Sequence, residues 1–475
     1  MRVLSVASEC APLVKTGGLA DVVGALPGAV AAEGVDMRVL LPGYPAVMAA
    51  VGDTTVAFSQ SALFGGTGRV LSARAHGIDL LIFEAAHLYD RPGNIYLGPD
   101  GKDWPDNPER FAALCQIAAR IAQSGVDGWM PDVIHAHDWQ AGLIPEYLDQ
   151  PGRKRRVGTV LTVHNMAFHG LADPAKIDLL GLDPARMDRD GFEFWGHVSA
   201  LKAGLIGADR LTTVSPSYAR ELMTEAFGMG LEGVMRMRRG DLSGILNGID
   251  TEVWNPATDA AVTRFTTPKG KAQNKRALRK AFDLPKADGP LCVLVSRLTD
   301  QKGVDMLLEV LPRLLAEGGQ LVVLGSGDPH YEDALRNAAR DPNVGVHIGY
   351  DEGMSHRLIA GGDAILVPSR FEPCGLTQLY GLRYGTIPLV ALTGGLADTV
   401  IDASPAARAV GAATGVQFHP VTAEAFGEAI TRLCALFRLT DEWAGMQENA
   451  MSHPVGWDMS ARAYAALYRD VTSPE

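Results

Sequence analysis

Two cations that follow an apolar run in the second half of the chain have the spacing of a phosphate-binding pair. Arg297 and Lys302 lie in residues 296–303, directly after the apolar run 291–295. An arginine and a lysine placed in this way can neutralise the negative charge that builds on a departing diphosphate. Taken alone, two such residues are more often solvated surface cations. The phosphate role therefore depends on the groups that accompany them.

A carboxylate and a glycine stand just before an expected helix in residues 369–378. Glu372 can hold sugar hydroxyls through charge-assisted hydrogen bonds. The backbone N–H groups of Gly375, Leu376 and Thr377 can bind phosphate at the helix start. Helix capping is the alternative role for Glu372. Together with the two cations, this segment predicts a site for a sugar that carries a phosphate.

The six-residue string Thr-Gly-Gly-Leu-Ala-Asp occurs twice, at residues 16–21 and 393–398. Each copy follows an apolar run and leads into a helix-like stretch, which predicts a strand, a glycine turn and a helix in both places. Adjacent glycines let a ligand approach the backbone, and a helix start presents unpaired N–H groups to an anion. We expect two similar halves that present glycine loops to one ligand, with a tight turn kept for folding as the alternative for either copy.

Two histidines and an aspartate end another apolar run. In a strand, His135 and His137 would lie on one face, and with Asp138 they resemble a partial metal site. We nevertheless expect no metal ion, because no clear fourth ligand follows and because lysine and arginine side chains supply the positive charge. His164, which closes the next strand, would by itself more often be a structural histidine.

These polar groups must be positioned by a chain in which short apolar runs alternate with longer helical stretches. The predicted strands are residues 3–7, 38–41, 80–83, 133–136 and 159–163 in the first half, and 291–295, 321–324, 344–348, 364–367 and 387–392 in the second; a helix is predicted at 108–124. Continuous apolar strands indicate parallel sheets that helices cover on both faces. Residues 244–268 lack such periodicity and predict a domain boundary. In sheets of this kind, ligands bind at the carboxyl ends of the strands.

Composition supports two domains and limits the partners. The chain has 475 residues, 47% of them hydrophobic, which exceeds what one hydrophobic core serves. A formal net charge of −12 argues against general nucleic-acid affinity. The five cysteines are scattered, and no signal peptide or membrane-spanning run is apparent. We expect a soluble, cytoplasmic protein with no nucleic-acid or membrane partner.

Six segments together resemble, in order and spacing, the family of bacterial glycogen synthases and plant starch synthases. They are residues 15–22, 135–140, 247–250, 296–303, 372–378 and 393–398. The resemblance covers essentially the whole chain, and the long motifs around Lys15 and Glu372 are highly specific. It implies the GT-B fold, in which two Rossmann-like α/β domains face a deep inter-domain cleft.

The same resemblance implies a domain arrangement and a reaction. Residues 1–250 would form the N-terminal domain, 251–454 the nucleotide-sugar-binding domain, and 455–475 a helix that crosses back to the first domain. Apolar side chains recur along that helix at roughly helical spacing, namely Trp457, Met459, Ala463, Tyr464, Leu467 and Tyr468. The implied reaction transfers glucose from ADP-glucose to the non-reducing end of an α-1,4-glucan such as glycogen, with retention of configuration and without a cofactor.

Individual roles follow from the motif positions. In the first half, Lys15, Gly17 and Gly18 would lie against the donor, with Asp21 in support. The groups that would face the transferred glucose or line the cleft there are Asp138, His164, Asn247 and Tyr96. In the second half, Arg297 and Lys302 would hold the diphosphate, and Glu372 the glucose 3- and 4-hydroxyls. Further substrate contacts are assigned to Cys374, Gly375, Leu376 and Thr377, and Tyr350 would stack on adenine.

Two positions depart from patterns that related enzymes share. Tyr380 stands where many other retaining GT-B enzymes have a second glutamate, which fits the glycogen synthase branch. His169 stands where the family commonly has glutamine, and this exchange could alter an acceptor contact.

The reaction would proceed by same-face attack, in which the leaving phosphate accepts the proton of the acceptor hydroxyl. Asp138 as a covalent nucleophile is the weaker alternative. A nicotinamide dehydrogenase is disfavoured because no complete Gly-x-Gly-x-x-Gly motif follows the first strand. A non-catalytic glucan-binding protein is disfavoured because no charged site group has been lost.

Overall fold

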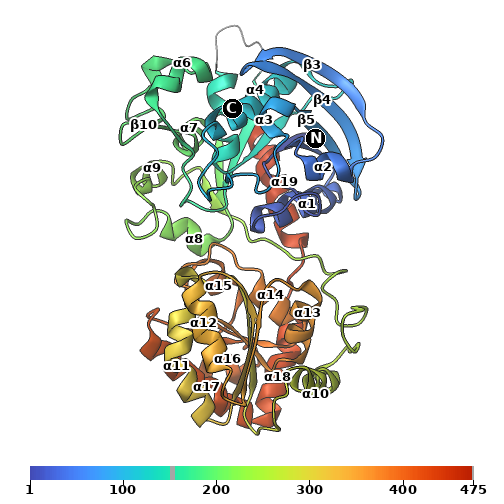
Figure 1. Cartoon of the computed structure of the whole chain (residues 1–475), viewed down its shortest axis with the longest axis vertical. Helices are drawn as coiled ribbons and strands as arrows, with labels where there is room; N and C mark the ends of the chain where they lie inside the picture. Colours follow the sequence, from blue (N-terminus) through green and yellow to red (C-terminus); the bar gives the residue numbers. More distant parts are fainter. Residues whose placement is uncertain (150–155, 473–475) are drawn as a thin grey trace. The chain divides into compact units, whose positions relative to one another are not determined.

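The computed structural model describes residues 1–149 and 156–472, which form two compact α/β units. Unit 1 comprises Met1–Asn247 together with Trp457–Glu475, and unit 2 comprises Gly248–Gly456. Each unit is built on its own sheet with helices packed against it (Figure 1). The fold predicted from the sequence, two Rossmann-like α/β domains, is confirmed.

Unit 1 contains a nine-stranded sheet in the order β12-β11-β7-β6-β1-β2-β5-β4-β3. Its strands are β1 (Arg2–Val6), β2 (Asp36–Pro42), β3 (Thr55–Leu63), β4 (Gly66–Ala75), β5 (Ile78–Glu84), β6 (Val133–His137), β7 (Gly158–Val163), β11 (Arg210–Thr213) and β12 (Leu242–Gly244). All neighbours pair in parallel except β3 with β4 and β4 with β5. The sequence did not predict the β3–β4 hairpin, because the edge strand β3 is mostly exposed or half-buried, β4 mixes buried and exposed positions, and neither has a continuous apolar run.

The helices of unit 1 cover this sheet. They are α1 (Gly18–Ala31), α2 (Pro45–Ala50), α3 (Ala86–Tyr89), α4 (Asn107–Ser124), α5 (Ile144–Leu148), α6 (Ile177–Leu180), α7 (Ala200–Gly207), α8 (Pro216–Glu221), α9 (Glu232–Met237) and α19 (Asp458–Thr472). A small antiparallel sheet, β8 (Leu171–Ala172), β10 (His197–Ser199) and β9 (Glu193–Phe194), adds to the unit and was not predicted.

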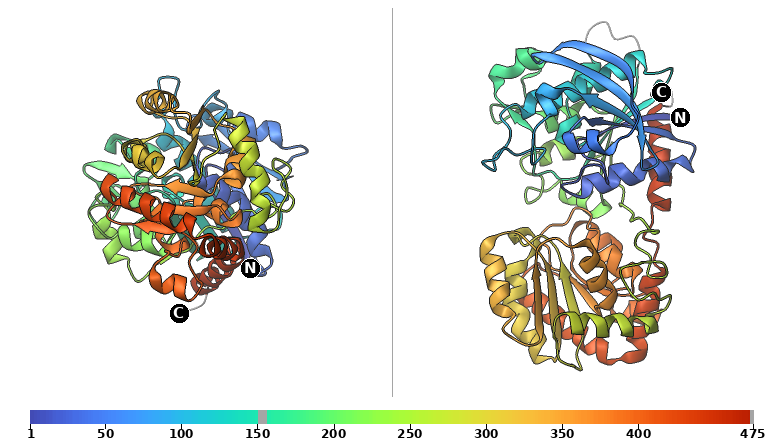
Figure 2. Two further views of the ribbon diagram at one scale, coloured as in Figure 1. Left: turned by 90° about the horizontal axis from the view of Figure 1, so that it is seen from below. Right: turned by 45° about the vertical axis from the view of Figure 1, so that its right-hand side comes forward.

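The last helix, α19, packs against α1, β6 and β7 of unit 1 (Figure 2). Tyr464 and Tyr468 are fully buried there, in a cluster with Val3, Val133 and Val160. The predicted apolar face was partly wrong, because Met459 and Ala463 are exposed, and the face is completed by the small residues Ala461 and Ala465. Small residues let the helix approach the strands closely.

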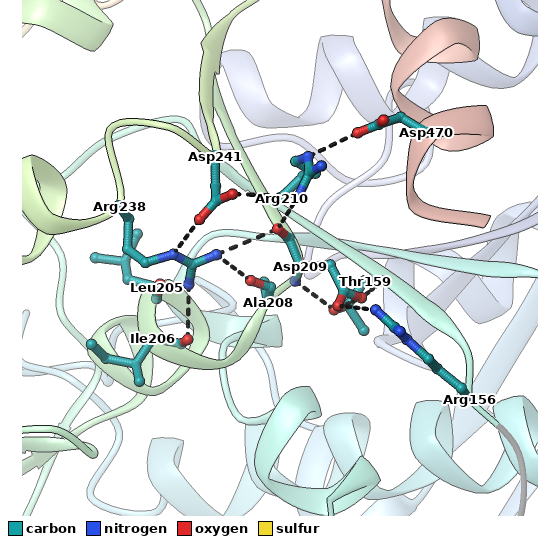
Figure 3. Close-up of polar contacts among 10 residues, drawn as sticks. All are labelled: Arg156, Thr159, Leu205, Ile206, Ala208, Asp209, Arg210, Arg238, Asp241 and Asp470. Atoms are coloured by element: carbon teal, nitrogen blue, oxygen red, sulfur yellow. Dashed lines mark hydrogen bonds and ion pairs between the residues drawn. The ribbon is translucent and has the colours of Figure 1, made fainter. Parts of the chain in front are cut away.

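A polar network also ties α19 to the sheet (Figure 3). Arg210 Nε on β11 donates to Asp470 Oδ2 on α19 at 2.8 Å. Arg238, on the same side, donates to the carbonyl oxygens of Leu205 and Ile206 at 2.7 and 2.8 Å, and so caps the end of α7.

Unit 2 contains a six-stranded parallel sheet in the order β15-β14-β13-β16-β17-β18. The strands are β13 (Leu291–Val295), β14 (Gln320–Gly325), β15 (Val344–Ile348), β16 (Ala364–Val367), β17 (Ile387–Ala391) and β18 (Val416–Phe418). The helices are α10 (Lys271–Ala281), α11 (Val304–Ala316), α12 (Pro329–Ala338), α13 (Glu352–Gly361), α14 (Thr377–Arg383), α15 (Gly394–Thr399), α16 (Pro405–Ala409), α17 (Ala423–Arg438) and α18 (Thr440–Ser452). They cover both faces, with α11 and α12 on one side and α13 and α14 on the other (Figure 1). Within the described parts of both units, we find no helix that is long and apolar enough to cross a membrane.

Candidate active site

The loop between β1 and α1 carries Lys15 and the first glycine pair. Gly17 is the N-cap residue of α1 and has extended backbone. A Cβ atom added to Gly17 or Gly18 would meet no atom within 4 Å, so packing requires glycine at neither position. Lys15 Nζ lies 2.7 Å from Asp21 Oδ1 in the first turn of α1. The ion pair therefore holds the lysine beside a stretch of backbone that a ligand can approach.

Glu9 organises this loop, and sequence reasoning missed it. Its carboxylate is only 3% exposed and accepts hydrogen bonds from the backbone N–H groups of Thr16 and Gly17 and from the Thr16 hydroxyl. Tyr96 also donates its hydroxyl to Glu9 at 2.6 Å, while Ser8 Oγ lies 2.7 Å from the same hydroxyl. One buried carboxylate thus joins the glycine loop to Tyr96.

Asp138 follows β6 and points back to the next strand. Its Oδ1 accepts the backbone N–H of His164 at 2.6 Å and that of Asn165 at 3.4 Å. Burial raises the pKa of Asp138 to about 7, although the two N–H donors oppose the shift, and the Glu9 carboxylate adds to it. Asp138 has a φ of 53°, a left-handed conformation that aspartate tolerates better than most residues. The structure therefore brings Asp138 and His164 together.

The three histidines at this edge form a buried hydrogen-bonded set. His137 Nδ1 lies 3.0 Å from His164 Nε2, and its Nε2 lies 3.1 Å from Ser5 Oγ. His135 is bonded on one side to Thr162 Oγ1 at 2.6 Å and on the other to the Tyr468 hydroxyl at 2.8 Å. Burial lowers the pKa of His135 and of His164 to about 3, so both rings are neutral at neutral pH.

These contacts give His135 and His137 a structural role, as hydrogen-bonding partners inside the protein core. Both ring nitrogens of each residue are already engaged with protein groups, and a metal would compete with these bonds. Among residues 1–149 and 156–472, no group of three or more His, Cys, Asp or Glu side chains could hold a metal ion. In the described chain His135 and His137 therefore belong to a buried hydrogen-bond network.

Asn247 ends unit 1. It is 8% exposed, and its Oδ1 is buried without a hydrogen-bond partner in the described chain. A buried amide oxygen without a partner is costly unless a ligand or water bonds to it. This is the kind of group expected in a ligand site.

In unit 2, Lys302 and Glu372 form an ion pair at the carboxyl ends of neighbouring strands. Lys302 Nζ lies 2.5 Å from Glu372 Oε2, which also accepts the Ser369 hydroxyl at 2.9 Å. The sequence predicted separate partners for these two side chains, phosphate for Lys302 and sugar hydroxyls for Glu372. Their pairing arises because the loops after β13 and β16 meet at the same edge of the sheet.

Two further contacts lock those loops together. Arg370 bonds both carboxylate oxygens of Asp305, at 2.8 and 2.6 Å. The Gln301 amide donates to the carbonyl oxygen of Phe371 at 3.1 Å. A bidentate arginine pair fixes orientation as well as distance, so Lys302 and Glu372 are preorganised.

Arg297 and Tyr350 lie exposed at the ends of their strands. Arg297 follows β13, and its guanidinium has no acceptor among the residues that the structure describes. Tyr350 follows β15 and is 85% exposed. Both side chains are therefore accessible at the carboxyl edge of the sheet of unit 2, as the sequence predicted for strand ends.

The loop before α14 is held from beneath by Gln378. The Gln378 amide donates to the carbonyl oxygens of Cys374 and Gly375 at 3.1 and 2.9 Å. Gly375 has a φ of 70°, which favours glycine. Cys374 is buried, whereas Leu376 is the N-cap residue, directly before Thr377 begins α14. The first backbone N–H groups of a helix have no partner within it, so this loop can offer donors to an anion.

The second glycine pair differs from the first in its packing, which favours for this copy the alternative of a tight turn kept for folding. A Cβ atom on Gly394 would lie 2.0 Å from the carbonyl oxygen of Glu372, and one on Gly395 would lie 2.1 Å from that of Cys374. Gly394 also has a φ of 45°. These glycines are required so that α15 can pack against the loop that carries Glu372.

Comparisons with known proteins place this geometry in a family. Residues 2–237 match the family model described as starch synthase catalytic domain, and residues 275–444 match glycosyl transferases group 1. The chain is 62% identical to a glycogen synthase of Paracoccus denitrificans over 98% of both chains, and 61% identical to one of Jannaschia sp. over 98% of both. The chain belongs to the glycogen and starch synthase family of glycosyltransferases.

Solved structures agree with this assignment. The catalytic domain of starch synthase IV from Arabidopsis thaliana, bound to ADP and acarbose, superposes with a TM-score of 0.89 at 32% identity over 99% of both chains. Sucrose-phosphate synthase from Thermosynechococcus elongatus, at 18% identity and a TM-score of 0.61, shares the fold. As a family member the chain is a glycosyltransferase with the GT-B fold.

Tyr380, the departure from the two-glutamate pattern, has a packing role in this family member. Its ring stacks on Trp254 with centroids 3.7 Å apart, and His356 stacks on the other face of Trp254 at 3.9 Å. Lys275 on α10 forms a largely buried ion pair with Asp363 at 2.5 Å.

Proposed function

We propose that the chain is a glycogen synthase that transfers glucose from ADP-glucose to the non-reducing end of an α-1,4-glucan with retention of configuration. The observation that carries the proposal is the identity of 62% to a glycogen synthase over 98% of both chains. The starch synthase that superposes at a TM-score of 0.89 was bound to ADP, which favours an adenine nucleotide as donor.

The side chains of this chain can be assigned roles in that reaction. Arg297, Lys302 and the N–H groups at the start of α14 would bind the leaving diphosphate, as the exposure of Arg297 and the position of Lys302 permit. Glu372, relieved of part of its pairing with Lys302 when phosphate binds that lysine, would accept glucose hydroxyls. Tyr350 would stack on adenine.

In unit 1, Lys15 and the backbone at Gly17 and Gly18 would contact the donor, where a Cβ would meet no protein atom. Asp138, His164 and Asn247 would face the transferred glucose. The acceptor O4 would bond to C1 of glucose as the C1–O bond to phosphate breaks, and the departing phosphate oxygen would take the hydroxyl proton. Neutral His164 suits this scheme, because it adds no positive charge near an oxocarbenium-like sugar.

The direct test is release of ADP from ADP-glucose with glycogen as acceptor and UDP-glucose as competitor. We expect turnover that requires both substrates and resists equimolar UDP-glucose. Transfer from UDP-glucose alone, or hydrolysis without glucan extension, would overturn the proposal.

The five cysteines are all free and buried, which fits a protein that acts in the reducing cytoplasm.

Activity is also expected to survive exhaustive EDTA treatment, because lysine and arginine supply the positive charge that the leaving diphosphate needs. The measurement is turnover after dialysis against EDTA, with metal content determined by elemental analysis. Loss of turnover on removal of a stoichiometric metal would instead revive ligation by His135, His137 and Asp138.

A further inference from the structure

The tip of the β9–β10 hairpin presents a tryptophan to solvent in an unfavourable backbone conformation. Trp195 is 83% exposed and has a φ of 49°, and Gly196 follows with a φ of 80°. Two consecutive positive φ angles are typical of a two-residue type I′ hairpin turn, whose first position favours asparagine or aspartate. A bulky side chain there is a true outlier, and such strain is typically found at functional positions.

The hairpin is held rigidly at its base. Gly196 N–H donates to Glu193 Oε1 at 2.7 Å, which closes the turn. Lys202 is buried on α7 and donates to the carbonyl oxygens of Arg189 and Glu193 at 2.7 and 2.6 Å. The exposed indole is therefore displayed by a fixed support.

The same hairpin is continuous with the loop that carries site residues. Phe194 packs edge-on against His169 with ring centroids 4.5 Å apart. Ser199 Oγ and the Leu201 N–H both donate to the His169 carbonyl oxygen, at 3.3 and 3.1 Å. His169 closes the segment that begins at His164, beside Asp138. The hairpin that carries Trp195 and the proposed transfer site are thus supported by the same loop.

We propose that Trp195 is a remote acceptor subsite that stacks on a glucose unit of a long α-1,4-glucan. This inference rests on the proposed function. The faces of a glucose ring carry C–H groups that pack on an indole while the hydroxyls stay in water. The position next to the site loop suits a polymer that extends away from the transfer site.

A single indole suits a sugar better than a protein partner. The neighbouring hairpin residues Gly196 and His197 are exposed, and the Arg189 and Asp190 side chains are 96% and 84% exposed. A stable protein interface buries about 800 Å² on each partner around an apolar centre. The exposed polar groups beside Trp195 instead offer partners for sugar hydroxyls.

Trp195→Asn tests the proposal, because asparagine is favoured in a type I′ turn and removes the indole without straining the hairpin. We expect the thermal midpoint to stay or rise, and the affinity for glycogen in native gels to fall about tenfold, as for loss of a central aromatic contact. The ratio of kcat/KM on glycogen to that on maltotetraose should fall in parallel. Trp195→Tyr should retain most of the glycogen affinity and of the kcat/KM ratio. Met237→Ala, which removes another exposed apolar side chain of unit 1, should change neither quantity.

Unchanged glycogen affinity and an unchanged ratio in Trp195→Asn would overturn the proposal. So would a change in oligomeric state by size-exclusion chromatography with glycogen binding intact, since it would assign the indole to a protein contact. If the wild-type enzyme turned over neither acceptor, the proposed function would fail. The native-gel comparison of wild type and Trp195→Asn on glycogen would still decide whether Trp195 binds glucan.

Discussion

Glu372 and Lys302, the pair to which we assign sugar and phosphate contacts, are fixed by protein groups before any ligand binds. Their Nζ–Oε2 contact of 2.5 Å and the 2.9 Å bond from Ser369 fix both side chains without a ligand. Phosphate can replace Glu372 as the partner of Lys302, because both are oxyanions. Arg297 has no such partner among the described residues, so in the proposed reaction its guanidinium would be free to bind the diphosphate.

Arg297→Ala and Lys302→Ala are each expected to lower kcat by about 10²–10³, which is typical for loss of one preorganised group that stabilises developing charge. The measurement is kcat for glucose transfer, with thermal unfolding to show that the variants fold. Arg336→Ala, which removes a half-exposed cation on α12, is the matched control and should keep wild-type turnover. Retention of more than half of wild-type kcat would show that the diphosphate role is wrong.

Asp138→Asn should stabilise the fold at alkaline pH. Burial raises the pKa of Asp138 to about 7 from 3.8, so the folded state holds a proton that the unfolded state releases between these values. Stability from this group is present at low pH and is lost as pH rises toward 7. The asparagine variant avoids that loss and gains up to roughly 4 kcal/mol at pH 8, and about half of that at pH 5.5.

The measurement for Asp138→Asn is denaturant unfolding at the two pH values. Asp333→Asn, on an exposed carboxylate, serves as control and should show no such pH dependence. Equal stability of wild type and Asp138→Asn at pH 8 would mean that the carboxylate is well solvated in the folded protein. Activity should fall in Asp138→Asn. The native carboxylate would then support activity while it lowers the stability of the fold.

At the scale of elements, the duplicated glycine string shows that identical sequence can serve two purposes. The helices α1 and α15 both begin at such a string. In unit 1 the glycines border open space, and in unit 2 they allow α15 to pack on the loop of Glu372 and Cys374. The difference lies in which neighbour the rest of the sheet places opposite each turn.

Gly395→Ala and Gly17→Ala should therefore differ in kind. Gly395→Ala places a Cβ about 2.1 Å from a backbone oxygen and should lower the free energy of unfolding by about 1–3 kcal/mol. Gly17→Ala should fold within about 0.5 kcal/mol of wild type but raise KM for ADP-glucose. Chemical denaturation and steady-state kinetics on both variants distinguish the roles. The reverse pattern would assign the ligand contact to the second copy.

At the scale of the whole molecule, the last helix completes the core of unit 1 although it comes from the far end of the chain. Tyr464 and Tyr468 are fully buried against β-strand residues Val133 and Val160, and the Tyr468 hydroxyl bonds to His135. The His135 and His137 rings are in tilted contact with centroids 4.1 Å apart, and His137 bonds to His164. The C-terminal helix is thus connected to the site through buried side chains.

Truncation before Trp457 should expose this apolar surface, leave His135 Nδ1 without its partner, and lower solubility, thermal midpoint and kcat together. Asp470→Asn is the control, because it removes only the partly exposed ion pair with Arg210, worth about 0–1 kcal/mol. A soluble truncated enzyme with unchanged kcat and KM would contradict the prediction.

The sequence by itself determined the alternation of strands and helices and the polar residues at strand ends. Continuous apolar runs such as 133–136 and 291–295 can be read locally, because a strand that is buried on both faces needs apolar side chains throughout. The β3–β4 hairpin was not predicted, because its strands mix exposed and buried positions and carry no continuous apolar run.

Only the tertiary structure decided the partners of those residues. The link from Glu9 to Tyr96, the pairing of Lys302 with Glu372, and the neutral histidine network all join segments far apart in sequence. The pKa of Asp138 depends on burial, and the role of each glycine pair depends on what faces it. Residue type fixes what chemistry a side chain can do, whereas its distance to other groups and to water exists only once the chain has folded.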